Sequence, residues 1–439
     1  MLSSLKLFTR TAAWDESLKR IVSSTFWLTS ERIYRLLVGV GITVWLARYL
    51  QPEGFGQLNY AVSFIALFAP VAGMGLDGLI VRGVLSKSNS KHEILGTAFV
   101  IRVVAGFAAI FIALAVSLFM HPLGSPVNGL VFILAATLLF QAAAPIDYWY
   151  QSHLRAVPPT LGRNIAFTAA TSARAVFILA GLPVMAFAWI ITGEALALAV
   201  ALFVAYGMSG ERVRLWTYSS SCARKMLKDS WPILLSAVAV VIYMKIDQIM
   251  LGQMLGARAV GIYSAATRIS ELWYFVPMAI VTSASPIIMA NWEQDRDAYV
   301  RKMIMLFRVM IGLSILVALP VTFFGNDVIR ILYGEHYKDA GVILAIHIWA
   351  GLFVALNVSQ WPAVFSEGLM IATLIRTSLG AITNVLLNLA LIPTYGMVGA
   401  AVATILSYGV AAVLANVMFS GGRRILAMQY RALMIWRPI

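Results

Sequence analysis

Apolar residues run through this chain in blocks of about twenty, separated by short polar stretches. A helix rises about 1.5 Å per residue, so about twenty apolar residues cross the ~30 Å hydrocarbon core of a bilayer. We therefore predict an all-α polytopic membrane protein with about twelve transmembrane helices. The predicted spans are residues 24–50, 57–82, 94–119, 128–152, 162–182, 185–207, 231–255, 260–290, 303–324, 340–363, 370–392 and 396–418. Only Gly181-Leu182-Pro183 separates the fifth span from the sixth, so one long kinked helix is the alternative there.

The composition supports a membrane protein and argues against a soluble enzyme or a nucleic-acid-binding protein. Of the 439 residues, 61% are hydrophobic and 12% are charged, whereas a soluble protein carries about 25% charged residues. The net charge of +14 is better explained by cytoplasmic loops than by a nucleic-acid partner. The single cysteine, Cys222, falls in a polar stretch that reads as a loop, and one cysteine cannot form an intrachain disulfide.

The distribution of loop charges sets the expected orientation. With twelve spans, 22 Lys and Arg residues fall on the side of both termini, whereas Arg48, Arg258, Arg330 and Lys338 fall on the other side. Such a bias marks the cytoplasmic side, so we predict that both termini are cytoplasmic. With eleven spans the second half would invert and the bias would collapse.

An internal repeat relates the two halves of the chain. Residues 50–61, LQPEGFGQLNYA, align with residues 255–266, LGARAVGIYSAA, at an offset of 205. Six spans in each half give both halves the same orientation, which predicts a parallel repeat about an axis along the membrane normal. The predicted organisation is a six-helix lobe at 1–207, a basic cytoplasmic linker at 208–230, a second six-helix lobe at 231–418 and a basic cytoplasmic tail at 419–439. The tail reads as an amphipathic segment that lies on anionic lipid.

Five stretches in order along the chain carry a family likeness. They are LARYLQPEGFGQLNYAVSF (46–64), PIDYWYQ (145–151), KIDQIMLGQMLGARAVGIYSAATRI (245–269), LYGEHYKDAG (332–341) and NVLLNLALIPTYGMVGAAVATILSY (384–408). Together they resemble the polysaccharide-unit flippases of bacterial inner membranes, the Wzx type of O-antigen and exopolysaccharide pathways. That family belongs to the multidrug/oligosaccharidyl-lipid/polysaccharide exporter superfamily. In the second stretch Asp147 and Gln151 keep the register of the family signature, whereas Tyr148 replaces the usual Trp.

The resemblance implies a transporter rather than an enzyme. Its cargo would be a glycan unit linked by diphosphate to a polyprenol, moved from the cytoplasmic to the outer leaflet by alternating access. Polymerase and chain-length components of the same pathway are the implied partners. The implied location is the bacterial inner membrane.

Intramembrane cations are the candidate substrate-binding residues. A charged side chain in hydrocarbon costs at least ~2.5–3.5 kcal/mol on insertion scales, so it usually faces a cavity or a partner. Guanidinium groups suit diphosphate because they offer paired donors in a fixed geometry. The alternative is that each cation snorkels to the interface or forms a structural ion pair. The candidates are Arg32, Arg35, Arg102, Arg174, Lys245 and Arg268.

Acidic residues are candidates for ion coupling or for pairing with those cations. Asp247 and Glu271 read as the deepest acids, and Asp147 lies in the family signature. A buried carboxylate can bind Na+ or a proton during transport, or it can neutralise a nearby Lys or Arg. No cofactor is predicted, and coupling to H+ or Na+ stays open. No motif for a metal cluster, a phosphate-cradling loop or a nucleophile triad stands out.

Other functions remain open at this point. An ion-coupled antiporter of small organic cations would favour an acidic chamber, and the deep cations argue against it. A lipid II flippase is a close relative that the sequence separates poorly from a polysaccharide-unit flippase. A membrane-embedded glycan polymerase or ligase would need a larger outer loop than the chain offers.

Overall fold

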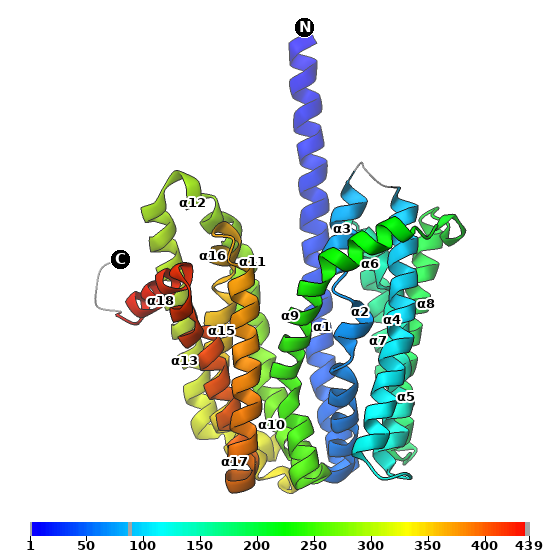
Figure 1. The fold of residues 1–439 in the computed structure, drawn as a ribbon, viewed down its shortest axis with the longest axis vertical. Helices are drawn as coiled ribbons and strands as arrows, with labels where there is room; N and C mark the ends of the chain where they lie inside the picture. Colours follow the sequence, from blue (N-terminus) through cyan, green and yellow to red (C-terminus); the bar gives the residue numbers. More distant parts are fainter. Residues whose placement is uncertain (1, 87–89, 435–439) are drawn as a thin grey trace. The chain divides into compact units, whose positions relative to one another are not determined.

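The computed structural model describes residues 34–86 and 90–434, and within them it is all-helical, as predicted. The α-helices are α1 (Leu2–Ala66), α2 (Ala69–Gly73), α3 (Asp77–Leu85), α4 (Lys91–Met120), α5 (Pro126–Phe140), α6 (Ala144–Ser152), α7 (Val157–Leu179), α8 (Val184–Met208), α9 (Ser220–Leu255), α10 (Ala257–Glu271), α11 (Phe275–Met289), α12 (Asn291–Gln294), α13 (Arg296–Tyr333), α14 (Ala340–His347), α15 (Ala350–Val358), α16 (Trp361–Ser366), α17 (Met370–Ala412) and α18 (Ser420–Leu433) (Figure 1). Short 3-10 helices occur at η1 (Gln141–Ala143), η2 (Val213–Leu215), η3 (Leu272–Tyr274), η4 (Glu335–Tyr337) and η5 (Leu414–Met418).

Nine stretches of the described chain are long and apolar enough to cross a membrane. Two of them, Tyr34–Leu85 and Met370–Met418, contain 52 and 49 residues. A straight helix of fifty residues would measure ~75 Å, more than twice the hydrocarbon core. Each contains a residue with non-helical backbone angles, Gln51 (φ 56°) in α1 and Gly396 (φ 59°) in α17. The chain is a multi-pass membrane protein, and its predicted count of twelve spans stays a prediction.

The turn at residues 181–183 separates two helices rather than kinking one. Gly181 has a positive φ of 71°, a conformation that glycine adopts without steric cost. The α7 and α8 helices on either side of it pack against each other.

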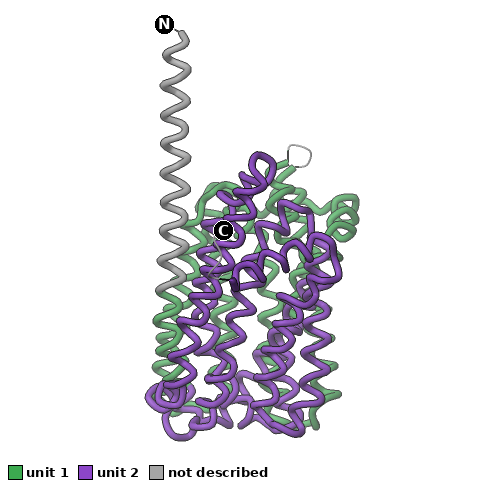
Figure 2. Tube along the Cα trace, turned by 90° about the vertical axis from the view of Figure 1, so that its left-hand side faces the viewer, with its two compact units in different colours: residues 1–46, 68–234 green, residues 47–67, 235–439 purple. Residues whose placement is uncertain are grey.

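The chain divides into two compact units, which Figure 2 shows in separate colours. Unit 1 comprises residues 1–46 and 68–234, and unit 2 comprises residues 47–67 and 235–439. The division falls inside α1 and inside α9, so neither helix belongs to one unit alone. In unit 1, α5 packs against both α4 and α8. In unit 2, α13 packs against α14, α15 and α18, and α17 packs against α14 and α15.

Within unit 2 the last part of α1 crosses α10 at two glycines. A Cβ atom on Gly56 would lie 1.8 Å from the carbonyl oxygen of Ala257, and one on Gly261 would lie 2.0 Å from the carbonyl oxygen of Pro52. Small residues allow helix backbones to approach this closely in a membrane protein. An offset of 205 residues, the one found in the sequence, relates Gly56 to Gly261 and Pro52 to Ala257. Each glycine therefore contacts the residue that corresponds to the other glycine's partner. The repeat as a whole stays a prediction.

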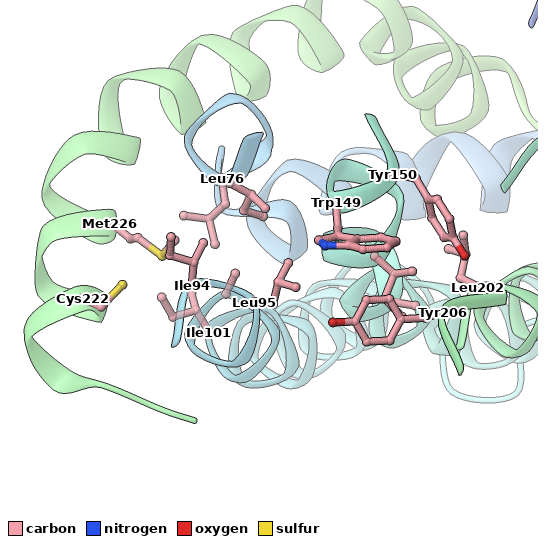
Figure 3. Close-up of a cluster of buried hydrophobic side chains, with 14 of the residues drawn as sticks. Leu76, Ile94, Leu95, Ile101, Trp149, Tyr150, Leu202, Tyr206, Cys222 and Met226 are labelled. Carbon is pink, nitrogen blue, oxygen red and sulfur yellow. The ribbon is translucent and has the colours of Figure 1, made fainter. Parts of the chain in front are cut away.

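The linker segment, which was expected to be a loop, and the tail, which was expected to lie on anionic lipid, both contain packed helices. Cys222, expected in a polar loop, lies in the first turns of α9 and is buried. It joins a hydrophobic cluster of unit 1 that includes Ile94, Trp149 and Met226 (Figure 3). The predicted tail contains α18, which packs on α13 with Ile425 and Met428 buried. In both segments the apolar face has helical spacing, which drives packing on protein in spite of the many polar residues.

Candidate functional site

Unit 1 holds a cluster of two arginines and one glutamate, which we call the unit 1 charge cluster: Arg35, Arg174 and Glu194. The Arg174 Nη2 atom donates to Glu194 Oε2 at 2.6 Å, and Arg35 Nη2 lies 3.7 Å from Glu194 Oε1. The side chains are 37%, 15% and 20% exposed for Arg35, Arg174 and Glu194. Two guanidinium groups therefore lie against the same carboxylate, and Arg35 makes further contacts as well.

Aromatic and hydroxyl groups position the cluster from α1 and α7. The guanidinium carbon of Arg35 lies 4.9 Å from the ring centroid of Phe167, and Tyr34 packs edge-on against the same ring. The Tyr34 hydroxyl also hydrogen bonds to Thr168 Oγ1 at 2.8 Å. A cation over an aromatic face is stabilised by the ring quadrupole, which holds Arg35 in place. Arg32, the predicted neighbour of Arg35 on the same helical face, lies outside the described residues.

Glu194 was missed by the sequence analysis, which took Asp247 and Glu271 as the deepest acids. It lies near the middle of α8 and is the only charged residue of that helix. Ten residues separate it from the start of α8, or ~15 Å along the axis. A single acid in an otherwise apolar run was the available signal.

Arg102 lies in an ion pair that is closed off by protein. Its Nη2 donates to Asp77 Oδ1, its Nη1 donates to the Gln141 carbonyl oxygen at 3.3 Å, and its guanidinium carbon lies 5.5 Å from the Tyr148 ring centroid. The side chain of Arg102 is 3% exposed, whereas that of Asp77 is 60% exposed. This arrangement favours the structural ion pair for Arg102 over the predicted contact with substrate.

Asp147 of the family-like signature is also paired. Arg163 Nη1 lies 3.1 Å and 3.0 Å from the two carboxylate oxygens of Asp147. Arg163 had been counted with the loop charges, but it lies in the second turn of α7 and holds the start of that helix to α6. The pairing favours a structural role for Asp147 over ion coupling.

Unit 2 holds a buried acid with a different set of partners, which we call the unit 2 polar cluster: Lys245, Asp247, Tyr263, His347 and Thr404. The Tyr263 hydroxyl donates to Asp247 Oδ2 at 2.6 Å, and the backbone NH of Gln248 donates to Asp247 Oδ1 at 2.8 Å. The Tyr263 hydroxyl also lies 3.3 Å from Thr404 Oγ1. Asp247 is 5% exposed. Among the described residues no Lys, Arg or His nitrogen lies within 4.0 Å of this carboxylate.

Lys245 and His347 lie near this carboxylate without an ion pair to it. Lys245 is half-buried on α9 and close enough to interact electrostatically with Asp247 and with His347. His347 is buried, and its Nδ1 atom hydrogen bonds to Ser270 Oγ at 2.6 Å. Glu271 is half-buried and also close enough to act on Asp247. The cluster and the neighbouring Glu271 therefore gather one cation, two acids and an imidazole from α9, α10 and α14.

Arg268 is placed apart from the hydrogen bonds of Asp247. It is exposed on α10 and interacts electrostatically with Tyr333 at the end of α13.

A second buried arginine, Arg376 of α17, had been counted with the loop charges. It donates to Gln360 Oε1 and, at 2.8 Å, to Asn416 Oδ1. It is 4% exposed. No group of three or more His, Cys, Asp or Glu side chains able to hold a metal ion occurs in residues 34–86 and 90–434.

Known proteins of similar fold are transporters. An inward-facing multidrug resistance MATE family transporter of the MOP superfamily has a TM-score of 0.71 at 16% identity, covering 90% of this chain and 96% of that one. The lipid II flippase MurJ in an inward closed conformation has a TM-score of 0.65 at 14% identity, covering 94% and 91%. Identities this low establish the fold alone.

Sequence comparison adds the family. A probable flippase, AglR, of Haloferax volcanii is 32% identical over 184 residues, which are 39% of this chain and 37% of that protein. The chain spans less than half of the length of the curated relatives that it matches. The profile of the family MatE matches residues 232–390. The profile described as polysaccharide biosynthesis protein matches residues 21–292. Because that match covers more than half of the 439 residues, the chain belongs to the family of polysaccharide biosynthesis proteins.

Proposed function

We propose that this protein is a flippase that moves polyprenyl-diphosphate-linked oligosaccharide units from the cytoplasmic to the outer leaflet for surface polysaccharide synthesis. It makes and breaks no covalent bond in this proposal. The family membership and the relative named as a flippase support it. The observation that carries it is the unit 1 charge cluster, in which Arg35 and Arg174 both lie against the carboxylate of Glu194.

The pair of neighbouring guanidinium groups fits a diphosphate headgroup. A phosphate that approaches two guanidinium groups gains charge-assisted hydrogen bonds, which are about twice as strong as neutral ones. One carboxylate holds the two arginines in the absence of cargo and limits the cost of burying them. Lys245 and Arg268 of unit 2, and Arg32 outside the described residues, complete the proposed set of substrate-binding cations.

The proposed location is the bacterial inner membrane with both termini in the cytoplasm. The uneven distribution of loop Lys and Arg residues supports this orientation. Polymerase and chain-length components of the same pathway are the proposed protein partners.

We propose that Asp247, with Glu271 as its neighbour, carries any coupling ion. Asp247 accepts hydrogen bonds from a hydroxyl and a backbone NH, so its carboxylate can exchange a proton or Na+ without breaking an ion pair. The inside-negative membrane potential already favours outward movement of an anion by ~2.3 kcal/mol per charge per 100 mV, so coupling sets the rate or the direction only in part.

A matched pair of triple variants tests the proposal. In proteoliposomes with a fluorescent polyprenyl-diphosphate oligosaccharide, we expect R174Q/K245Q/R268Q to lower the initial rate of translocation at least about a hundredfold, from three lost charge contacts. The control, R258Q/R330Q/K338Q, removes three exposed cations of the predicted outer loops and should translocate at the unmodified rate. Equal rates in the two triple variants would overturn the cationic mechanism.

The same vesicles separate the alternatives. The similar folds of a multidrug transporter and a lipid II flippase keep both activities as candidates. Efflux of a cationic dye driven by a proton or sodium gradient would indicate an antiporter. Translocation of lipid II faster than of the oligosaccharide lipid would indicate the lipid II activity.

A further inference from the structure

A basic pocket lies in unit 2 where α18 packs beside the start of α13. Its cavity has a volume of about 340 Å3. The lining residues that matter here are Trp292, Arg296, Tyr299, Glu367, Arg424 and Arg431. Three arginines and one carboxylate give this pocket a charge excess of two positive charges.

The single acid of the pocket is already bonded. Arg424 Nη2 donates to Glu367 Oε2 at 2.5 Å, and the Tyr299 hydroxyl donates to Glu367 Oε1 at 3.4 Å. The Glu367 side chain is 3% exposed, so it presents little negative charge to solvent. Its ion pair with Arg424 holds the guanidinium group in position. The guanidinium carbon of Arg296 lies 3.2 Å from the ring centroid of Trp292, which holds that cation in place as well. Arg296 and Arg424 are therefore positioned before any ligand arrives.

The lining face of α18 adjoins bare apolar side chains. Arg424, Ala427 and Arg431 follow helical spacing and line the pocket. Tyr430 and Leu433, one helical turn apart on α18, are each 60% exposed. A pocket of arginines, which can bind phosphate, beside exposed apolar side chains is the pattern expected of a protein site that binds a lipid at the membrane interface.

A helical segment with a similar sequence and burial pattern occurs at the start of α9 in unit 1. Residues 221–227, SCARKML, align with residues 420–426, SGGRRIL, at an offset of 199, with Ser, Arg and Leu identical. In both segments the second, third and sixth residues are buried, and the fourth and fifth are exposed. Figure 3 shows Cys222 and Met226, two of the buried ones, pointing toward the α4 side chains.

A pocket adjoins the unit 1 segment too. It has a volume of about 190 Å3 and is lined by Arg82, Lys225 and Asp229 among others. Lys225 occupies the position of Arg424 in the alignment. Its charge excess is one, against two in the unit 2 pocket.

We propose that the unit 2 pocket binds the headgroup of an anionic phospholipid from the surrounding leaflet, with Arg296, Arg424 and Arg431 on its phosphate. The acyl chains lie along the exposed apolar side chains of α18. The unit 1 pocket is a weaker copy of the same site. The site lies within unit 2, shares no residue with the unit 1 charge cluster or the unit 2 polar cluster, and does not depend on the proposed flippase activity.

Lipid binding by the purified 439-residue chain tests this site. In nanodiscs of phosphatidylcholine with a small fraction of spin-labelled phosphatidylglycerol, the unmodified protein should retain the anionic lipid preferentially. We expect R424Q/R431Q to weaken that retention about thirtyfold, from ~1 kcal/mol per cation. The control, R423Q/R214Q, removes two exposed arginines that do not line the pocket, one of them adjacent to Arg424, and should retain the lipid as before.

Further variants protect the test against a loss of folding. R431Q leaves the bond between Arg424 and Glu367 intact and should still weaken retention about fivefold, whereas R431K should restore most of it. Equal losses in the R424Q/R431Q and R423Q/R214Q variants would overturn the proposal, because general surface charge would then explain the retention. Displacement of the lipid by millimolar inorganic phosphate would show a phosphate site instead of a lipid site. Preferential displacement by polyprenyl diphosphate would show a cargo site, and either result would also overturn the proposal.

Discussion

The two units place acids and cations in opposite relations. In unit 1, Glu194 is a bridge between Arg35 and Arg174, and all three charges depend on one another. In unit 2, Asp247 is bonded to the Tyr263 hydroxyl and a backbone NH, and Lys245 lies nearby without an ion pair to it. The first arrangement favours an incoming anion, and the second leaves a carboxylate able to change its own charge. If the two halves arose by duplication, their polar interiors have since diverged.

Removing the acid from each cluster should give the largest difference in stability between the two units. Glu194→Gln removes the carboxylate to which Arg174 is bonded and against which Arg35 lies, so we expect a loss of about 3 kcal/mol in the free energy of unfolding. Asp247→Asn removes no ion pair and should cost about 1–2 kcal/mol through its hydrogen bonds. Chemical denaturation in detergent measures both. Equal losses would mean that the two arginines do not depend on Glu194.

The two clusters should also differ in what their variants do to transport. Arg174→Lys keeps the charge but loses the planar fork, so the apparent Km for the diphosphate lipid should rise about tenfold. Asp247→Asn should leave that Km unchanged and reduce the response of the rate to an imposed proton or sodium gradient. A gradient response that survives in Asp247→Asn would remove the coupling role of this acid.

The Arg102 pair offers an internal contrast within unit 1. Asp77→Asn leaves a buried guanidinium without its counter-charge and should lower stability by about 1–3 kcal/mol. The Km of the protein that remains folded should be unchanged, since Arg102 is closed off from solvent. A Km shift as large as that of Arg174→Lys would return Arg102 to the substrate-binding residues.

The smallest expected effect concerns the pH dependence of stability caused by Glu367, which follows α16 and is bonded to Arg424 of α18. Burial raises the pKa of Glu367 above its usual range, and Arg424 and Arg296 offset this only in part. The folded state therefore takes up a proton more readily than the unfolded state. The resulting stability is fully present below the unfolded pKa and is lost as pH rises through the raised pKa. Thermal unfolding between pH 4 and pH 7 should show a decline with rising pH that Glu367→Gln abolishes.

The fold class was predictable because span length and apolar composition are local properties of the sequence. Arg174 and Lys245 were recognisable as intramembrane cations for the same reason. Their partners were not: Glu194 is 20 residues from Arg174, and the two meet only because α7 and α8 form a hairpin. The contact of Tyr263 with Asp247 likewise needs the turn between α9 and α10.

Other residues were misplaced because charged side chains were assumed to lie in solvent-exposed loops. Arg376 lies six residues into α17, so it resembled a loop cation, yet amide oxygens of Gln360 and Asn416 satisfy it inside the protein. The 221–227 segment carries enough Arg, Lys and Ser to resemble a loop, whereas the 420–426 segment was read as amphipathic and placed on lipid. The burial pattern shows that the apolar faces of both segments pack on protein.

The reciprocal glycine crossing has a consequence for biosynthesis. Gly56 leaves the ribosome about 205 residues before Gly261 does, a delay of ~10–40 s at ordinary elongation rates. During that interval the surface around Gly56, within residues 47–67, must face lipid, because its partner helix α10 has not been synthesised. In nascent chains arrested shortly before residue 257, a cross-linker placed near Gly56 should therefore react with the surrounding lipid. In chains arrested well beyond residue 271, the yield of this cross-link should fall because α10 covers Gly56.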